Sequence, residues 1–298
     1  LVIDSALHFL PHHPAFLLKK ANLQLASGKP REALQTLDSL QQVDPHNPAA
    51  KALRDQIRIA SYHQAIGLDY NFTAFGDRTT TPWNLASLYY QRMPNWGSYN
   101  IRLSFANRQN RNGLQAETEI YWNHDSANTS YLDLAYAQDS IFPRLRGAYT
   151  FTHYFRKGWQ ADVGGRYLNF NSSGFSSAFL GLGKYFSDYW LYGQAYLTPQ
   201  HHRLFGAYRL TLRYYYSEYR DDYLNLILGT GLSPDDRSRY FQLNRWLSLS
   251  STNIAIGYQH IFRGQTIVGL TAGWTNQEIS QGIRQNEYDV YVHLVQKF

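Results

Sequence analysis

The chain has 298 residues, no cysteine, a formal net charge of +6 and a negative mean hydropathy of -0.47. It is long enough for one large β domain or two ordinary domains, and no stretch approaches the roughly 20 apolar residues of a membrane-spanning helix. Aromatic residues are abundant, with 25 Tyr, 16 Phe and 7 Trp, and the arginines are scattered along the chain, which argues against nucleic acid as a partner.

Residues 1–60 have a helical pattern unlike the remainder of the chain. Gly28, Ala33 and Pro45 fall where a tetratricopeptide repeat places its central turn, its closest helix contact and the end of its second helix. Such repeats bury a core only against neighbouring helices. A plain helical hairpin is the alternative. In either case we expect an interaction or spacer module that lies in the periplasm and contacts protein partners.

From about Ser61 the period of the apolar residues changes to two, which is typical of strands with one apolar and one polar face. In 99–108, for example, Tyr99, Ile101 and Leu103 alternate with polar side chains. About fourteen strands are predicted, each long enough to cross a bilayer with tilt. Their ranges are 62–75, 83–92, 99–108, 114–123, 129–138, 144–156, 159–170, 175–186, 189–198, 203–217, 223–230, 253–262, 265–275 and 288–298.

The predicted connections alternate in length. Short ones at 95–97, 156–158, 187–189, 219–222 and 263–265 follow every second strand, and several intervening ones are longer, notably 231–251 and 277–287. Outer-membrane barrels have short periplasmic turns, longer extracellular loops and an even number of strands. A soluble sandwich has no reason to sort its loops in this way. We therefore expect residues 61–298 to form a transmembrane antiparallel β-barrel in outer-membrane lipid, with the C-terminus in the periplasm.

The last eleven residues, YDVYVHLVQKF, alternate cleanly and end on an aromatic residue. They resemble the closing strand of a bacterial outer-membrane barrel, where the terminal aromatic residue belongs to the signal that the β-barrel insertion machinery recognises. The residues assigned to this signal are Tyr288, Val290, Val292, Leu294 and Phe298.

Several further segments resemble the YaiO family of outer-membrane proteins. They are WNLASLYYQR (83–92), SIFPRLRGAYTF (140–151), KGWQADVGGRYLNF (157–170), GLGKYFSDYWLY (181–192), GTGLSPDDRS (229–238) and TAGWTNQEIS (271–280). The resemblance covers roughly residues 62–298, and the preceding tetratricopeptide-like segment is similar to that family's arrangement. It implies an outer-membrane barrel associated by analogy with exopolysaccharide secretion. Exporters for poly-N-acetylglucosamine and cellulose likewise join periplasmic helical repeats to a barrel. A fold transfers more safely than an activity.

Strand parity assigns ionisable side chains to the lumen, because an Arg or Lys facing lipid at mid-depth costs about 2–4 kcal/mol. One interpretation is a conduit in which guanidinium groups bind sugar hydroxyls or acidic substituents and Tyr rings stack on sugar faces. The other is a ladder of ion pairs that braces the wall and fills the lumen. Acids and arginines are balanced, so selectivity for an anionic polymer does not follow. The lumen-lining candidates are Asp69, Arg102, Arg108, Glu117, Glu119, Asp133, Arg146, Asp162, Arg166, Arg209, Arg213, Asp289 and His293.

No catalytic constellation is expected, and neither is a metal or a cofactor. The pairs His12–His13 and His201–His202 lack a third ligand at metal spacing. His293 has the inward placement that barrel hydrolases use beside a serine, but the sequence does not place any hydroxyl against it. Asp235 and Asp236 admit either calcium binding or a polar capping turn, of which the turn is favoured.

The segment 231–251 contains the amphipathic, aromatic stretch 239–247. The sequence leaves three roles open for it: constriction of the lumen, extension of the wall, or docking of a partner. We expect passage of an extracellular polysaccharide as the function of the chain. The competing hypothesis is a non-transporting structural or docking subunit that contacts its partners through the helices or the extracellular loops.

Overall fold

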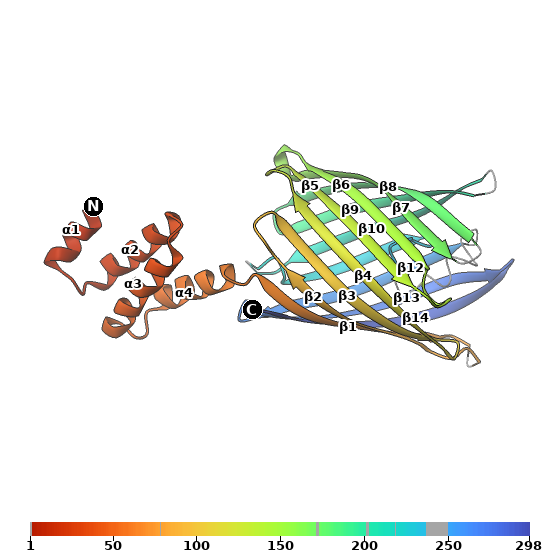
Figure 1. Ribbon diagram of the computed structural model, residues 1–298, viewed down its shortest axis with the longest axis horizontal. Coiled ribbons are helices and arrows are strands. Elements are labelled where there is room, and N and C mark those ends of the chain that lie inside the picture. The colour runs from red at the N-terminus through yellow and green to blue at the C-terminus, as the bar shows by residue number, and fades with distance from the viewer. Residues whose placement is uncertain (1, 78, 171–172, 201–202, 218, 237–249) are drawn as a thin grey trace. The chain divides into compact units, whose positions relative to one another are not determined.

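The computed structural model describes residues 2–77, 79–170, 173–200, 203–217, 219–236 and 250–298. It divides the chain into a helical unit, which comprises residues 1–63 with Arg263–Gln265 and Phe298, and a barrel unit that comprises the remainder from Gln64 onward (Figure 1). No helix among the described residues combines the length and the hydropathy needed to cross a membrane.

The helical unit contains α1 (Val2–Phe9), α2 (Pro14–Ala26), α3 (Pro30–Val43) and α4 (Pro48–Ala60). Each of α2, α3 and α4 has proline in its first turn, where no backbone N–H is needed. Gly28 adopts a φ of 73° at the turn between α2 and α3, a conformation that favours glycine. Ala21 and Ala33 are fully buried, so these two helices approach closely.

The barrel unit is a closed antiparallel barrel of fourteen strands, in which each strand pairs with its sequence neighbours and β1 closes on β14. This confirms the predicted fold class. The strands are β1 (Gln64–Phe75), β2 (Trp83–Arg92), β3 (Gly97–Arg108), β4 (Arg111–Asn123), β5 (Asn128–Ala137), β6 (Leu145–Tyr154), β7 (Trp159–Phe170), β8 (Ser173–Phe186), β9 (Tyr189–Gln200), β10 (Arg203–Tyr215), β11 (Tyr223–Thr230), β12 (Ser251–Phe262), β13 (Thr266–Ser280) and β14 (Ile283–Lys297).

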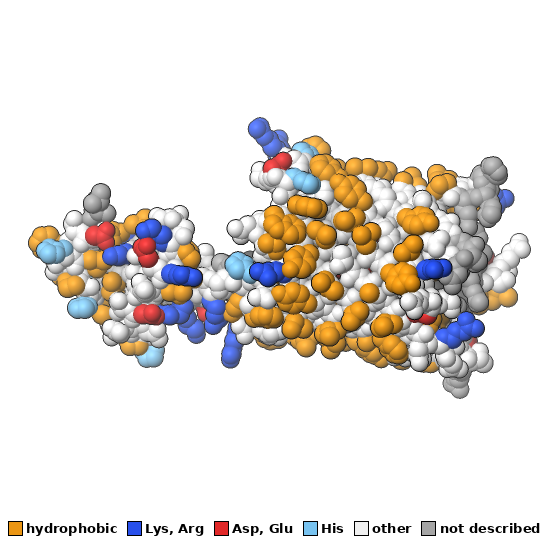
Figure 2. All heavy atoms as spheres, in the orientation of Figure 1, with side chains coloured by type: hydrophobic (Ala, Val, Ile, Leu, Met, Phe, Trp, Pro, Cys, Tyr) orange, Lys and Arg blue, Asp and Glu red, His pale blue; other side chains and the backbone are white. Residues whose placement is uncertain are grey.

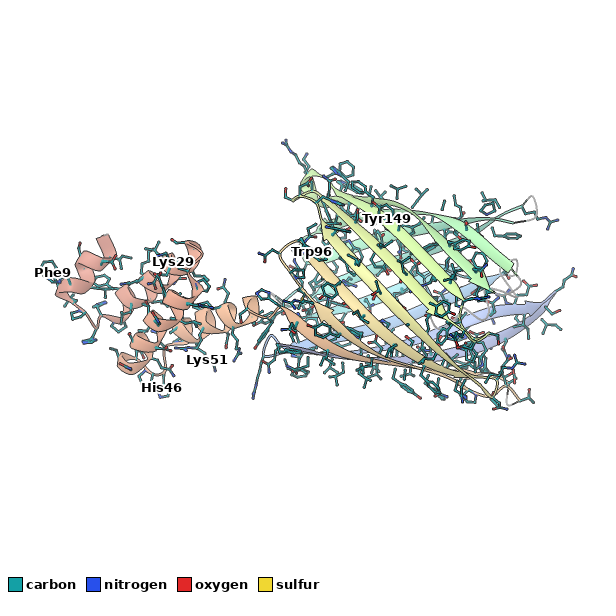
Figure 3. The ribbon with its side chains drawn as sticks, viewed as in Figure 1. Phe9, Lys29, His46, Lys51, Trp96 and Tyr149 are labelled. Carbon is teal, nitrogen blue, oxygen red and sulfur yellow. The ribbon has the colours of Figure 1, made fainter. Side chains whose placement is uncertain are left out.

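Alternation sorts the side chains of the barrel into an apolar outer face and a polar inner face. On β3, Ile101 and Leu103 are more than half exposed, whereas the intervening Arg102 and Ser104 are buried. The same pattern continues around the wall, so apolar side chains cover the outside of the strands (Figure 2). Tyr149 projects from β6 among these outward side chains (Figure 3). Such a surface matches the hydrocarbon of a bilayer.

The two ends of the barrel differ in their connections. We call the end where β1 begins and β14 stops the terminal end, since Ala65 lies opposite Lys297 there. It carries compact connections such as 93–96, which contains Trp96, and Ser187–Asp188 (Figure 3). The opposite end, the loop end, carries the longer connections 76–82, 138–144 and 231–250.

One predicted connection is wrong. Residues 277–287 are strand rather than loop, because β13 and β14 continue to a tight turn in which Gly282 has a φ of 75°. Gln277 pairs with Gln285 and Asn276 with Asn286 in the ladder. Beyond the apolar band a strand has no need of apolar outward residues, so this polar part of the hairpin has the composition of a loop.

Candidate functional site

The described inner face of the barrel carries the predicted ionisable residues, at two levels of burial. Most have less than a tenth of their surface exposed: Asp69, Arg102, Arg108, Glu117, Glu119, Asp133, Arg146, Asp162 and Arg166. Four are partly exposed on inward strand positions: Arg209, Arg213, Asp289 and His293. The residues assigned to the insertion signal lie on the outer positions of the closing segment and are 39–49% exposed: Tyr288, Val290, Val292, Leu294 and Phe298.

The inner face of β1–β6 forms a continuous ion-pair network, which we call the charged wall: Asp69, Arg102, Glu117, Glu119, Asp133 and Arg146. Arg102 Nη1 donates a hydrogen bond to the Asp69 carboxylate, and Arg102 Nη2 lies 3.7 Å from Glu119 Oε2. Arg146 Nη2 lies 3.0 Å from Glu117 Oε1 and 2.5 Å from Asp133 Oδ2. Buried charges persist only when they are paired in this way.

The charged wall extends onto β14 through His293. Its Nδ1 lies 2.6 Å from Asp69 Oδ1, so this carboxylate joins a histidine and a guanidinium. In the described part of the chain no Ser or Thr hydroxyl is hydrogen-bonded to His293; Ser104 pairs instead with Ser87, at 2.8 Å between the hydroxyl oxygens. The arrangement therefore holds an Asp–His pair with no hydroxyl nucleophile hydrogen-bonded to it.

The start of the β11–β12 connection enters the barrel. Asp235 accepts two hydrogen bonds from Arg166, at 2.6 Å from Nε to Oδ1 and 3.0 Å from Nη2 to Oδ2. Tyr196 donates to the same carboxylate at 2.8 Å, and Arg166 also donates to Thr150 Oγ1 at 2.8 Å. Burial by itself would raise the pKa of Asp235, but the bonds and charge of Arg166 hold that pKa below its ordinary value.

Of the three roles left open for residues 231–251, constriction of the lumen agrees best with residues 231–236, which enter the barrel. Leu232 is 3% exposed, and Asp235 spends both carboxylate oxygens on protein donors. The stretch 239–247 lies outside the described residues, as does the pair His201–His202.

An apolar cluster lies at the loop end. Ile141 and Phe142, from the β5–β6 connection, are each 1% exposed and pack with Leu232. Asp139 fixes that connection, because its Oδ1 accepts from the backbone N–H of Ile141 at 3.0 Å and its Oδ2 from that of Leu114 at 2.7 Å. We call this the loop-end cluster; its remaining members are Leu85, Ala106, Ala137, Leu168, Phe170 and Phe175.

The inner face of β11–β13 differs from the charged wall because small residues recur along it. We call it the small-residue wall: Gly229, Ala255, Gly257, Gly269 and Gly273, interleaved with Asn225, Gln259 and Thr271. In the ladder Gly257 lies opposite Asn225 and Thr271, and Gly269 lies opposite Gln259. At Gly269 and Gly273 the missing side chains leave room in front of the wall, since an added β-carbon there would have no contact closer than 3.4 Å.

Two of the cavities lined by described residues lie inside the barrel. One of about 390 Å³ lies in front of part of the small-residue wall; we call it the neutral cavity. It is lined by Tyr223, Asn225, Ile227, Tyr258, Gln259, Gly269, Thr271, Tyr291 and His293. The other, of about 300 Å³, is lined by Asp69, Asn71, Leu85, Ser87, Arg102, Arg209, Asp235, Asp236 and Tyr291; we call it the charged cavity. Tyr291 lines both, so the two cavities adjoin.

Near the terminal end, Arg213 lies against aromatic rings. Its guanidinium carbon is 3.9 Å from the ring centre of Tyr223 and 5.0 Å from that of Trp190. Trp190 also stacks on Tyr192, with 4.8 Å between the ring centres. Aromatic faces attract a guanidinium through their quadrupole, which accommodates this charge within the wall.

Comparisons with known proteins agree with this architecture. The family model described as the YaiO membrane beta barrel domain matches residues 63–236, and a tetratricopeptide repeat model matches residues 2–57. A search of curated proteins found no match.

Among solved structures the chain is similar to "CymD monoaromatic hydrocarbon channel", with 8% identity, 83% of this chain and 92% of that chain covered, and a TM-score of 0.51. It is also similar to "Bacterial polysaccharide outer membrane secretin", with 7% identity, 80% and 99% covered, and a TM-score of 0.50. At these identities the likeness shows a shared fold, which is a porin-like outer-membrane barrel.

Proposed function

Because the chain belongs to the YaiO membrane β-barrel domain family, we propose that it conducts an extracellular polysaccharide across the outer membrane. One observation carries this proposal: two adjoining cavities, lined largely by hydroxyl, amide and charged groups, lie inside the barrel below an apolar cluster. Polar groups that converge on a cavity are suited to weak, repeated contacts with sugar hydroxyls. One structural neighbour is named as a bacterial polysaccharide secretin of the outer membrane, which is consistent with this substrate class.

The helical unit would then lie in the periplasm. The barrel begins and ends at the terminal end, where compact connections gather, and periplasmic turns of outer-membrane barrels are short. A tetratricopeptide segment needs neighbours to complete its core, so protein partners would bind there and hold the polymer near the barrel.

A second function is favoured by a different observation. The charged wall pairs its buried charges internally, and the loop-end cluster packs apolar side chains across the interior. A barrel filled in this way suits a structural or docking subunit, whose partners would bind the helices or the outer loops.

Single-channel conductance in a planar bilayer separates the two functions. The double variant Ile141→Ser with Phe142→Ser removes the two apolar side chains that the β5–β6 connection contributes to the loop-end cluster, and it should raise conductance from a low level to a steady, ohmic one. Leu145→Ser, which changes an outward residue directly after the same connection, is the matched control and should conduct like wild type. No conductance from inserted double variant would contradict the conduit and support the docking function.

Secretion in cells tests whether the conduit carries a polymer rather than ions alone. Deletion of the gene should leave polysaccharide in the periplasm, and expression of the full chain should restore it to the medium. If secretion is unchanged by the deletion, polysaccharide passage is contradicted even when the double variant conducts.

A further inference from the structure

We propose that the neutral cavity is a binding subsite for an uncharged sugar residue that carries hydroxyl or acetamido groups. This inference rests on the proposed passage of a polysaccharide and adds the chemical class of the sugar. The cavity volume of about 390 Å³ lies within the range of roughly 300–1,000 Å³ found for small-molecule sites.

The lining of the cavity supplies neutral donors and acceptors. Gln259 accepts from the Tyr223 hydroxyl at 2.9 Å and donates to the Asp221 carbonyl at 3.1 Å, which fixes its amide plane. Thr271 contributes a hydroxyl. Asn225 Oδ1 accepts no hydrogen bond from any described residue, so this amide keeps hydrogen-bonding capacity that a sugar hydroxyl or an acetamido N–H would satisfy.

Glycine creates the space. A β-carbon added at Gly269 would lie 3.4 Å from His293 Cβ and 3.6 Å from Gln259 Oε1, which are ordinary contacts, so the backbone there admits a side chain. Because Gly269 has no side chain, the part of the neutral cavity in front of it stays open. At Gly257 the Asn225 and Thr271 side chains instead lie over the bare backbone, since an added β-carbon would lie 2.1 Å from Asn225 Oδ1.

The charge distribution excludes ionised sugars from this cavity. Within the described part of the chain, its lining includes no Lys, Arg, Asp or Glu. The histidine of this lining, His293, is bonded to Asp69. Two charged groups contact lining residues and have partners of their own. Arg213 lies on the rings of Tyr223 and Trp190. Asp69 pairs with Arg102 as well as with His293. A carboxylate or ammonium entering the cavity would lose its hydration without gaining a counter-charge, whereas hydroxyl and amide groups exchange water for protein partners.

Isothermal titration of the purified full chain in detergent tests this inference with three defined tetrasaccharides at pH 6. They are tetramers of N-acetylglucosamine, which is uncharged, of galacturonate, which is acidic, and of glucosamine, which is cationic. We expect the uncharged tetramer to bind at least tenfold more tightly than either charged one.

Gly269→Leu should fill the cavity and weaken binding of the uncharged tetramer at least tenfold. Gly273→Leu is the matched control: it lies on the same face of β13, its added β-carbon would also have no contact closer than 3.4 Å, and it does not line the neutral cavity. It should leave affinity within twofold. Thr271→Val keeps the side-chain shape and removes one hydroxyl, so it should weaken binding about two- to tenfold even if Gly269→Leu folds poorly.

Tight binding of the acidic or cationic tetramer that Gly269→Leu weakens would overturn the uncharged class and leave polysaccharide passage standing. Absence of binding by every tetramer, together with steady conductance in the Ile141→Ser/Phe142→Ser variant and restored secretion, would overturn the subsite alone. Absence of binding together with unchanged secretion in the deletion strain would overturn both proposals.

Discussion

The charged wall and the small-residue wall belong to one barrel, and their outer faces are alike, but their inner faces differ. On β1–β6 long ionisable side chains reach one another and fill space, as where Arg102 contacts carboxylates from β1 and β4. On β11–β13 Gly269 and Gly273 leave space for a side chain, since an added β-carbon would have no contact closer than 3.4 Å at either position. Lipid requires an apolar outer face on every strand. The inner face has no such requirement, so one part of it can be filled by ion pairs while another part lines a cavity.

This difference gives the two walls separate roles. The charged wall gains its order from buried ion pairs, each of which is costly to break because an unpaired charge remains. The small-residue wall holds its amides and hydroxyls around a cavity and contributes little to bracing. Substitutions on the two walls should therefore affect different properties: stability on the first, and ligand binding on the second.

The largest effect is expected from Arg102→Ala. It takes the Arg102 guanidinium away from Asp69 and Glu119, which should lower the free energy of unfolding by about 3–5 kcal/mol. Urea unfolding followed by heat-modifiable gel mobility measures this. Thr271→Val on the small-residue wall is the comparison and should cost less than about 1.5 kcal/mol. Equal losses in the two variants would contradict the division of roles.

The next effect is expected from Gly164→Ala on β7. An added β-carbon would lie 2.0 Å from the Tyr149 carbonyl oxygen, which accepts a hydrogen bond from Arg166 Nη1 at 3.0 Å. Backbone must shift to admit it, which should cost about 1–3 kcal/mol. Gly273→Ala, with no added contact closer than 3.4 Å, should stay within about 0.5 kcal/mol of wild type in the same unfolding assay. If Gly164→Ala leaves the free energy of unfolding unchanged, the backbone of β7 admits the added methyl group without cost, and this prediction is wrong.

A smaller effect is expected where an ion pair is not buried. Lys297 Nζ lies 2.6 Å from Asp221 Oδ2 at the terminal end, and both side chains keep a quarter to a third of their surface exposed. A double-mutant cycle with Lys297→Met and Asp221→Asn should give a coupling of about 0.2–1 kcal/mol. If this coupling energy is as large as the loss of stability in Arg102→Ala, an exposed pair stabilises as much as a buried one. Burial would then not explain the contribution of the charged wall to stability.

The smallest effect is expected from acid between pH 7 and pH 5. Asp235 lies in the β11–β12 connection, and its pKa is lowered from 3.8 by Arg166. A depressed carboxyl pKa contributes stability in full above the ordinary value and loses it as pH falls through the lower, folded value. Conductance should thus stay constant to pH 5 and rise only below about 3.8. A rise already between pH 7 and pH 5 would show that the Arg166–Asp235 pair does not hold the connection in place.

Sequence alone predicts most of this fold. The alternation of side chains along the strands predicts a membrane barrel, because most outward positions within the bilayer must be apolar. The closed barrel of fourteen strands confirms this prediction. The pattern fails at 277–287, where β13 and β14 leave the apolar band and that constraint no longer acts. The tetratricopeptide resemblance was visible in Gly28 and Ala33, since each helical turn and contact depends on a single small residue.

The interior was less accessible to prediction. Parity places Asp69, Arg102 and Arg166 on the inner face, but which charges meet depends on register and on side-chain reach across the lumen. The loop-end cluster was missed because Ile141 and Phe142 are two apolar residues inside a polar connection, which is their sole signal. The inward glycines Gly257, Gly269 and Gly273 are a sequence signal for the small-residue wall. Whether a glycine leaves open space, however, depends on which side chains of the neighbouring strands lie opposite it.

Thiol accessibility is the most direct test of the account, because the chain has no cysteine of its own. Thr271→Cys places a thiol at the neutral cavity, and Ser104→Cys places one in the charged wall, where Ser104 is 1% exposed. In the folded, inserted barrel a water-soluble methanethiosulfonate reagent should modify the first rapidly and the second at least tenfold more slowly. Equal rates, or faster modification at position 104, would contradict the division of the inner face into a filled charged wall and an open cavity at the small-residue wall.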